Sequence, residues 1–260
     1  MVKVLAIMGS PRVRGNTYKV TKILEERMGS AGDVEFEYLF LREANLKTCL
    51  GCRACMERGE EFCPLKDDRA AIEEKMLAAD GVIFASPTYV GNVSGLMKNF
   101  IDRFAYVCHR PRFFKKALVL TTSGGGGAGF MMMSFSIAPS TWGFRVTNKL
   151  AVVTHEHEED YSRKEWKAFE NAKDKKVDKA AQAFYNALKK EPRPGIFQMA
   201  TFLYTKPFYR KRNPASVDYK YWKAHGWLEN DAYYYYNPKA GSIKKGLAML
   251  VSKFLGLVAK

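Results

Sequence analysis

Residues 2–17 read VKVLAIMGSPRVRGNT, and this stretch decides how the fold begins. Residues 2–8 form an apolar run interrupted by one lysine, which is typical of a buried parallel strand. Apolar residues then recur at helical spacing over 17–32, a segment that ends at glycine. The connection over residues 9–17 is longer than the roughly two to six residues usual between a strand and a helix. The stretch predicts a strand, a long loop and a helix.

The composition of this loop indicates that it binds a phosphate group. Ser10 and Thr17 supply hydroxyls, and Asn16 and Thr17 are good helix N-caps. Arg12 adds positive charge, and the glycines let the backbone approach closely. The alternative is an ordinary capped connection. The loop carries neither the lysine of an ATP-binding loop nor the glycine pattern of a dinucleotide-binding loop.

The strand–loop–helix pattern repeats along the first 155 residues. Further strands are expected at 34–41, 81–89, 115–123 and 149–155, and helices at 67–80, 95–108 and within 129–145. Nearly unbroken apolar strands predict an α/β fold with a doubly wound, five-stranded parallel sheet covered on both faces. Ligands of such sheets bind at the carboxyl ends of the strands, where the loops 9–17, 86–94 and 122–129 would meet.

In chain order, the loops GSPRVRGNT (9–17), SPTYVGNVSG (86–95) and TTSGGGG (121–127) resemble those of the NADPH-dependent FMN reductase group of flavodoxin-like proteins. The cysteine segment between the first two loops narrows the resemblance to one branch of this group, the iron–sulfur flavoproteins and the cluster-free relatives of these flavoproteins. The resemblance covers about residues 1–155. It implies three groups of FMN-binding residues: Ser10, Arg12, Gly15, Asn16 and Thr17 at the phosphate; Pro87, Thr88, Tyr89, Gly91 and Asn92 along the flavin ring and ribityl chain; and Ser123, Gly124 and Gly125 as a third wall.

The residue types of the second and third loops agree with a bound flavin. Pro87 and Tyr89 offer flat surfaces on which a ring can stack. The glycines at 124–127 can present N–H groups without side chains in the way. Flavin chemistry requires no catalytic side chain, because the cofactor carries the electrons. Tyr89 could instead pack on its own domain.

Four of the five cysteines lie close together, with the spacing C-x2-C-x2-C-x7-C: Cys49, Cys52, Cys55 and Cys63. Three thiolates at this spacing can reach one iron–sulfur cube, as in bacterial ferredoxins. The resemblance implies that the four ligate a [4Fe–4S] cluster. Zinc, redox thiols and inert cysteines are the alternatives. Cys108 stands alone and is interpreted as a buried structural cysteine.

The positive charge of the chain is concentrated in its C-terminal part. The net charge is +15 overall, with +2 in residues 1–160 and +13 in residues 161–260. We expect a flavodoxin-like domain over 1–160 with a cysteine-motif insertion at 47–66, followed by a basic, helical and aromatic-rich extension over 161–260. That extension begins with a long amphipathic helix over 163–190, and aromatic residues crowd its sequence from about 195.

Three kinds of partner fit this extension. The favoured interpretation is that the extension wraps a second subunit, in a homodimer or homotetramer, or covers the sheet, so that an interface buries the aromatic residues. A peripheral membrane contact through the amphipathic segment 242–260 is the second. Nucleic acid is not expected, because no recognisable binding motif is present. His155 and His157, among the carboxylates of Glu156, Glu158 and Glu159, are interpreted as a solvated acidic loop rather than a metal site.

The sequence therefore predicts a cytoplasmic, FMN-dependent oxidoreductase that passes electrons from NAD(P)H or a reduced ferredoxin to an acceptor, through a [4Fe–4S] cluster. The acceptor could be a small redox protein or a quinone. One alternative is a cluster-free NAD(P)H:quinone or FMN reductase. Another is a flavin-binding membrane-surface or interaction protein without enzymatic activity. The cytoplasmic location is expected because no apolar run of transmembrane length and no signal peptide is visible.

Overall fold

The computed structural model describes residues 1–155 and 158–258. It divides the chain into two compact units, here called the sheet unit (residues 1–50 and 65–191) and the aromatic unit (51–64 and 192–260). The elements of the sheet unit are β1 (Val2–Met8), α1 (Asn16–Ala31), β2 (Val34–Phe40), α3 (Arg69–Ala78), β3 (Gly81–Pro87), α4 (Gly95–Arg103), η2 (Ala105–Cys108), β4 (Lys116–Ser123), α5 (Ala128–Phe135), α6 (Ile137–Thr141), β5 (Arg145–Val153), η3 (Glu158–Asp160) and α7 (Arg163–Leu188). The aromatic unit holds α2 (Ala54–Glu57), η1 (Glu60–Phe62), α8 (Ile196–Arg210), α9 (Val217–Ala224) and α10 (Ser242–Val258).

The sheet has five parallel strands in the order β2-β1-β3-β4-β5, which confirms the predicted flavodoxin-like fold. From β1 the chain moves to β2 on one side, and the later strands β3, β4 and β5 follow on the other side, so the direction of winding reverses between the neighbouring strands β1 and β3. At such a switch point, the loops leaving the two strands turn to opposite faces and open a crevice. The predicted site loops follow β1, β3 and β4, so the strand order brings them to one edge.

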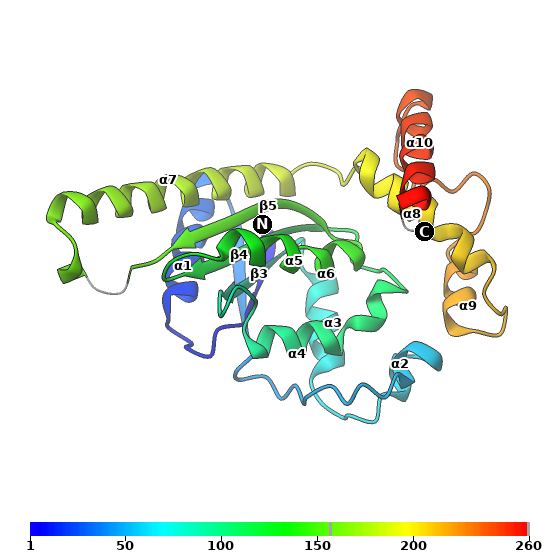
Figure 1. Ribbon diagram of the computed structural model, residues 1–260, viewed down its shortest axis with the longest axis horizontal. Coiled ribbons are helices and arrows are strands. Elements are labelled where there is room, and N and C mark those ends of the chain that lie inside the picture. The colour runs from blue at the N-terminus through cyan, green and yellow to red at the C-terminus, as the bar shows by residue number, and fades with distance from the viewer. Residues whose placement is uncertain (156–157, 259–260) are drawn as a thin grey trace. The chain divides into compact units, whose positions relative to one another are not determined.

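One face of the sheet is covered by α1 and α7 (Figure 1). Alternate residues of β1, β3, β4 and β5 form a single buried cluster with Leu24 of α1 and Phe184 of α7. The boundary expected at residue 160 is therefore wrong: α7 belongs to the sheet unit, which extends to Glu191. The physical reason is that α7 buries its apolar stripe against the sheet, where its side chains join the buried cluster.

The other face carries α3 and α4 (Figure 1) and a group of packed aromatic rings. Phe84 of β3 lies with its ring centroid 5.3 Å from that of Phe144 and 6.0 Å from that of Trp142, both edge-on. Phe100 of α4 meets Trp142 at 5.7 Å. All four side chains are fully buried. Edge-to-face packing at these distances stabilises the core beyond simple area burial.

The aromatic unit has a core of its own. The ring of Trp222 stacks on Tyr209 at 4.0 Å and on Phe202 at 5.6 Å. Trp227 donates its indole N–H to the Tyr235 carbonyl at 2.9 Å and is buried. These aromatic residues were expected to lie in a subunit interface. The expectation is wrong for these side chains, since they are buried within their own unit.

Three local expectations are corrected. The helix expected over 95–108 ends at Arg103 and continues as the 3₁₀ turn η2. Cys108, at the end of that turn, is exposed rather than buried, with its Sγ 3.1 Å from the Thr141 hydroxyl. Strand β5 begins at Arg145, four residues earlier than predicted. Among the described helices, none combines the length and apolar character needed to cross a membrane.

Candidate functional site

The site begins where β1 ends, at a glycine that no other residue could replace without movement. Gly9 donates its N–H to the Ala85 carbonyl of β3 at 2.7 Å, and the Ser94 hydroxyl donates to the Gly9 carbonyl. A Cβ atom on Gly9 would lie 2.8 Å from the Cβ of Met97 in α4. The close approach of β1, β3 and α4 at the switch point therefore requires glycine.

The loop from Ser10 to Thr17 folds on itself before α1 starts. The Ser10 hydroxyl accepts the Arg12 N–H at 3.1 Å and donates to the Arg12 carbonyl at 3.0 Å. The Gly15 N–H also donates to the Arg12 carbonyl, at 3.1 Å. Ser10 and Thr17 are buried. The result is a compact turn that presents the first turn of α1.

The N-cap of α1 is Gly15, and no described side chain caps this helix. This corrects the expectation that Asn16 or Thr17 serves as the cap. Instead, both lie in the first helical turn, where Asn16 Nδ2 donates to Thr154 Oγ1 at 3.1 Å and Thr17 Oγ1 lies 2.7 Å from Thr122 Oγ1. A helix end that lacks a side-chain cap offers N–H groups and the positive end of its dipole to an anion.

The second loop is tied to β4 and ends in a tight turn. Thr88 donates its N–H to the Thr122 carbonyl at 2.8 Å, which continues the pairing of β3 with β4. Tyr89 and Asn92 exchange two backbone hydrogen bonds, of 2.8 and 3.0 Å. Val90 and Gly91 between them have φ values of 49° and 72°. Positive φ at both central positions is the geometry of a type I′ turn.

Val90 is an unusual residue for this turn, because a β-branched side chain disfavours positive φ. Its side chain is fully exposed, so burial does not compensate the strain. We expect Val90→Gly to raise the free energy of unfolding by about 0.5–1 kcal/mol, since left-handed backbone costs roughly 1–2 kcal/mol and the added chain entropy of glycine offsets only part of that. Urea denaturation of the apoprotein measures this change.

Val13→Gly is the matched control, because Val13 is a loop valine outside the positive-φ residues. It should lower the free energy of unfolding by about 0.5–1 kcal/mol. Equal destabilisation by both replacements would contradict the assignment of strain to Val90.

The third loop runs from Ser123 to Gly127. The Ser123 hydroxyl donates to the carbonyls of Gly125 and Gly126 at 2.9 and 3.0 Å and accepts the Gly125 N–H at 3.1 Å. Gly127, with φ of 87°, lies close to Gly91 and Thr88 of the second loop. The two loops therefore close against each other at the edge of the sheet.

These loops line one open pocket at the carboxyl ends of the strands. Ten of the thirteen residues predicted to bind the cofactor line it: Ser10, Arg12, Gly15, Asn16, Thr17, Pro87, Thr88, Tyr89, Ser123 and Gly124.

Three predicted residues belong to the same loops but do not line the pocket. The Asn92 side chain accepts the Val93 N–H at 2.8 Å, and Gly91 lies within the Tyr89 turn. Gly125 donates its N–H to Ser123. Thr122 and Thr154 line the pocket and were missed. Both are hydroxyl residues at strand ends, which is the signal that could have identified them.

The geometry of this pocket suits a ligand with one anionic end and one flat end. Backbone N–H groups and hydroxyls gather at the start of α1, and Tyr89, which is 44% exposed, also lines the pocket. Comparison with known proteins shows the family to which the chain belongs. A family model described as NADPH-dependent FMN reductase matches residues 2–159.

The chain belongs to this family. It is similar to an iron–sulfur flavoprotein of Methanocaldococcus jannaschii, with 40% identity over 39% of this chain and 51% of that protein. An iron–sulfur flavoprotein of Archaeoglobus fulgidus is 42% identical over 39% of this chain and 48% of its own length. The chain thus spans about half the length of the curated relatives it matches.

Solved structures support the fold of this FMN reductase family member. An NAD(P)H:quinone oxidoreductase from Methanothermobacter marburgensis superposes with a TM-score of 0.52 and 19% identity, over 73% of this chain and 98% of that one. At this identity the likeness concerns the fold alone.

The cysteine motif of this FMN reductase family member falls on both units. Cys49 belongs to the sheet unit, and Cys52, Cys55 and Cys63 belong to the aromatic unit. None of these four cysteines is fully buried. In the part of the chain that the structure describes, no three cysteine, histidine or acidic side chains come close enough together to hold a metal ion. The donor chemistry fits an iron–sulfur cluster, but the positions of the side chains do not, so no chemical step is derived through one.

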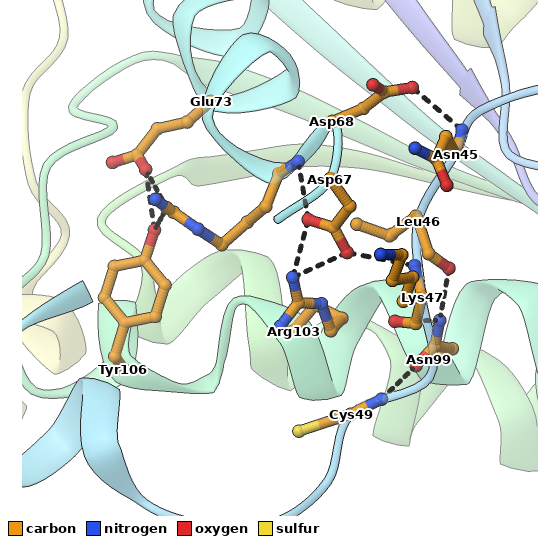
Figure 2. Close-up of polar contacts among 11 residues, drawn as sticks. Asn45, Leu46, Lys47, Cys49, Asp67, Asp68, Glu73, Asn99, Arg103 and Tyr106 are labelled. Atoms are coloured by element: carbon orange, nitrogen blue, oxygen red, sulfur yellow. Dashed lines mark hydrogen bonds and ion pairs between the residues drawn. The ribbon is translucent and has the colours of Figure 1, made fainter. Parts of the chain in front are cut away.

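The two ends of the cysteine segment are anchored to the sheet unit by a buried polar cluster, shown in Figure 2. Asp67 accepts two hydrogen bonds of 2.7 Å from Arg103 of α4, and these side chains are 0% and 3% exposed. Asp67 also accepts the Lys47 N–H at 3.0 Å. The Asp67 carboxylate, which follows the cysteine segment, therefore binds both Lys47, which precedes that segment, and Arg103 of α4.

Asn99 of α4 completes this anchor. Its Oδ1 accepts the Cys49 N–H at 3.0 Å, and its Nδ2 donates to the Leu46 and Lys47 carbonyls at 3.2 and 3.3 Å (Figure 2). Asp68 accepts the Asn45 N–H at 2.8 Å. The backbone that carries Cys49 is thus fixed on the sheet unit, next to the chain that returns at Asp67.

A second cluster lies beside this anchor. Glu73 of α3 accepts hydrogen bonds from Arg69 at 2.7 Å, from Arg112 at 2.6 Å and from the Tyr106 hydroxyl at 2.6 Å. Burial and the Glu73 carboxylate raise the pKa of the Tyr106 hydroxyl. Tyr106 therefore stays protonated and acts as a structural donor.

The histidines add no described catalytic arrangement. His155 Nδ1 lies 2.9 Å from the Tyr161 hydroxyl, and its ring lies 4.1 Å from that of Phe169. Glu156 and His157, which belong to the expected acidic loop, lie outside the described residues.

Proposed function

We propose that this chain is an FMN-dependent oxidoreductase that passes electrons from NAD(P)H or a reduced ferredoxin to an acceptor such as a quinone or a small redox protein. One observation carries the proposal: the three loops that resemble FMN-binding loops line one pocket beside the switch point of the sheet. The family of the chain and the names of its relatives support it.

In this proposal the FMN phosphate binds at the start of α1. The hydroxyls of Ser10 and Thr17, the side chain of Arg12 and the N–H groups of the first turn supply donors and positive charge. Phosphate is favoured over a carboxylate, because several donors converge where no described side chain caps the helix.

The flavin ring would lie between the second and third loops. Pro87 and Tyr89 provide apolar surface for the ring, and the Gly124 backbone can approach its polar edge without a side chain in the way. When bound, FMN supplies hydride and single-electron transfer; the residues of this chain position it and limit its contact with water. The sequence shows no second nucleotide-binding motif, so NAD(P)H would dock over the exposed side of the ring.

Turnover distinguishes this proposal from the non-enzyme alternative. NADH or NADPH mixed anaerobically with FMN-loaded protein should bleach the flavin absorbance at least as fast as the enzyme turns over in the steady state. Addition of a quinone should restore the absorbance. If neither nucleotide nor reduced ferredoxin reduces the flavin, the protein is a flavin-binding protein and the proposed activity is wrong.

We also propose that Cys49, Cys52, Cys55 and Cys63 ligate a [4Fe–4S] cluster. Their spacing and the names of the iron–sulfur flavoprotein relatives support this. The backbone around the cysteines turns sharply, with positive φ at Gly51, Arg53 and Gly59. Assembly would require the side chains to move together. Iron, sulfide and zinc analysis of anaerobically purified protein separates a cluster from a zinc site.

Cys52→Ser tests the cluster separately from the flavin. We expect it to abolish the broad visible absorbance and the bound iron, while the FMN content stays unchanged, because the cofactor pocket lies entirely in other loops. Cys108→Ser is the matched control, since Cys108 is also an exposed free thiol but lies outside the motif. Iron that survives Cys52→Ser, or is lost equally in Cys108→Ser, would contradict the assignment.

A further inference from the structure

Helix α10 places its large apolar side chains on the outside. Ile243, Leu247, Leu250, Phe254 and Leu257 are between 45% and 83% exposed. Their spacing of four, three, four and three residues puts them in one stripe along the helix. A contiguous exposed apolar stripe of this kind marks an interaction surface.

The opposite side of α10 is already occupied within the aromatic unit. Ala248 is fully buried, and Gly256 lies with its Cβ position 3.8 Å from the ring of Tyr204 in α8. Lys244 donates to the Pro194 carbonyl at 2.7 Å, next to the start of α8. Small residues face the neighbouring helix and large apolar residues face away, so the stripe is not an incomplete part of the core.

Helix α8, which packs against α10, carries exposed apolar side chains of its own. Phe197 and Phe208 are 65% and 56% exposed, and they share a helical face with Tyr204, the residue that α10 contacts. The rings of Tyr204 and Phe208 lie 5.4 Å apart. The exposed phenylalanines therefore belong to the side of α8 that meets α10.

The charge around the stripe has one sign. The charged residues of α10 are Lys244, Lys245 and Lys253, without a carboxylate. On a helical wheel, the exposed Lys253 falls on one flank of the stripe, and Lys244, which is bonded to the Pro194 carbonyl, falls on the other. Residues 192–260 together carry a net charge of +9, from 12 basic and 3 acidic side chains. An apolar stripe flanked by lysines is the pattern of a helix that lies in the surface of a bilayer, with its cations at the headgroups.

We propose that α10 and the adjoining face of α8 form a docking surface for an anionic lipid bilayer. Charge complementarity favours this occupant over a second copy of the chain, because a symmetric contact through α10 would bring its lysines together with no carboxylate on the helix to pair with them. The inference does not depend on the flavin site, since every residue that carries it belongs to the aromatic unit.

Flotation of the full chain with vesicles tests this surface. The wild-type protein should float with vesicles of phosphatidylcholine containing phosphatidylglycerol, should not float with phosphatidylcholine alone, and should be released as salt is raised. Leu250→Ser with Phe254→Ser should weaken binding at least about tenfold, because two apolar side chains no longer enter the bilayer. Lys253→Glu should weaken it about fivefold or more.

Leu77→Ser is the control, since Leu77 is 43% exposed on α3 of the sheet unit and should bind as the wild type does. The substituted stripe residues are exposed, so the variants should keep the wild-type unfolding midpoint. Failure of the wild-type chain to bind anionic vesicles overturns the proposal. The proposal is also overturned if the wild-type chain sediments as a dimer, the double variant sediments as a monomer, and neither binds vesicles. In that case the surface binds a second copy of the chain.

Discussion

Replacing Asn16 with aspartate is expected to weaken FMN binding by about 100-fold. Asn16 lines the pocket in the first turn of α1, so the new carboxylate would face the phosphate dianion across a partly desolvated space. The same charge at a helix N-terminus stabilises the protein without ligand, by about 0.3–1 kcal/mol. The variant should therefore lose FMN affinity without losing stability of the apoprotein. Fluorescence titration and thermal unfolding of the apoprotein measure the two effects.

Asn186→Asp is the matched control, an exposed asparagine of α7. It lies two residues before Leu188, which packs over Gly81 at the amino end of β3, opposite to the pocket. Its FMN affinity should equal that of the wild type. An Asn16→Asp variant with unchanged affinity would show that no phosphate binds at the start of α1.

Asp67→Ala is expected to cost about 3–5 kcal/mol of stability, because it leaves the Arg103 guanidinium buried without its carboxylate. In a protein of this size, such a loss lowers the midpoint of thermal unfolding by roughly 10 °C. Differential scanning calorimetry measures this change. The backbone of Lys47 and Arg69 would lose an acceptor in the same variant.

The exposed pair Lys98–Asp102 of α4 provides the control for Asp67→Ala. Its side chains are 58% and 42% exposed, so Asp102→Ala should cost less than about 1 kcal/mol. Asp67→Ala combined with Arg103→Met should recover part of the lost stability, since the buried guanidinium charge is removed together with the carboxylate. If Asp67→Ala behaves like Asp102→Ala, the buried cluster does not anchor the cysteine segment.

Much of the sheet unit could be predicted from the sequence because its inner strands β1, β3 and β4 are buried on both faces. A continuous apolar run such as VKVLAIM at 2–8, within a β–loop–α pattern, is typical of a central parallel strand. The place of α7 could not be predicted in the same way. Its apolar stripe shows that it covers something, but the pattern does not say which surface.

The aromatic unit was predicted less well, since its helices α8 and α9 lack a simple polar and apolar alternation. Phe202, Trp222 and Trp227 are buried. Aromatic residues are so frequent in this part of the sequence that these three do not stand out as core residues. Local composition therefore showed that aromatic surface must be covered, without showing that the unit covers it itself. The outward stripe of α10 is the apolar surface that the unit does not cover itself.

The candidate site shows the same division. The loops were found because glycines and hydroxyls follow strands in an order that the topology brings to one edge. Thr154 was missed because it acts through its contact with Asn16, which is 138 residues away in sequence. The cap of α1 was assigned to Asn16 or Thr17 on residue preference, whereas Gly15 occupies it and leaves those side chains to line the pocket.

Titration of the apoprotein with FMN and, in parallel, with riboflavin tests the central claim most directly. The two ligands share the flavin ring and differ in the phosphate, which is the group that the loop from Ser10 to Thr17 is proposed to bind. We predict FMN binding with a Kd below about 1 μM and riboflavin binding at least about 100-fold weaker. Equal affinity for the two ligands, or no binding of FMN, would contradict the proposed function of this pocket.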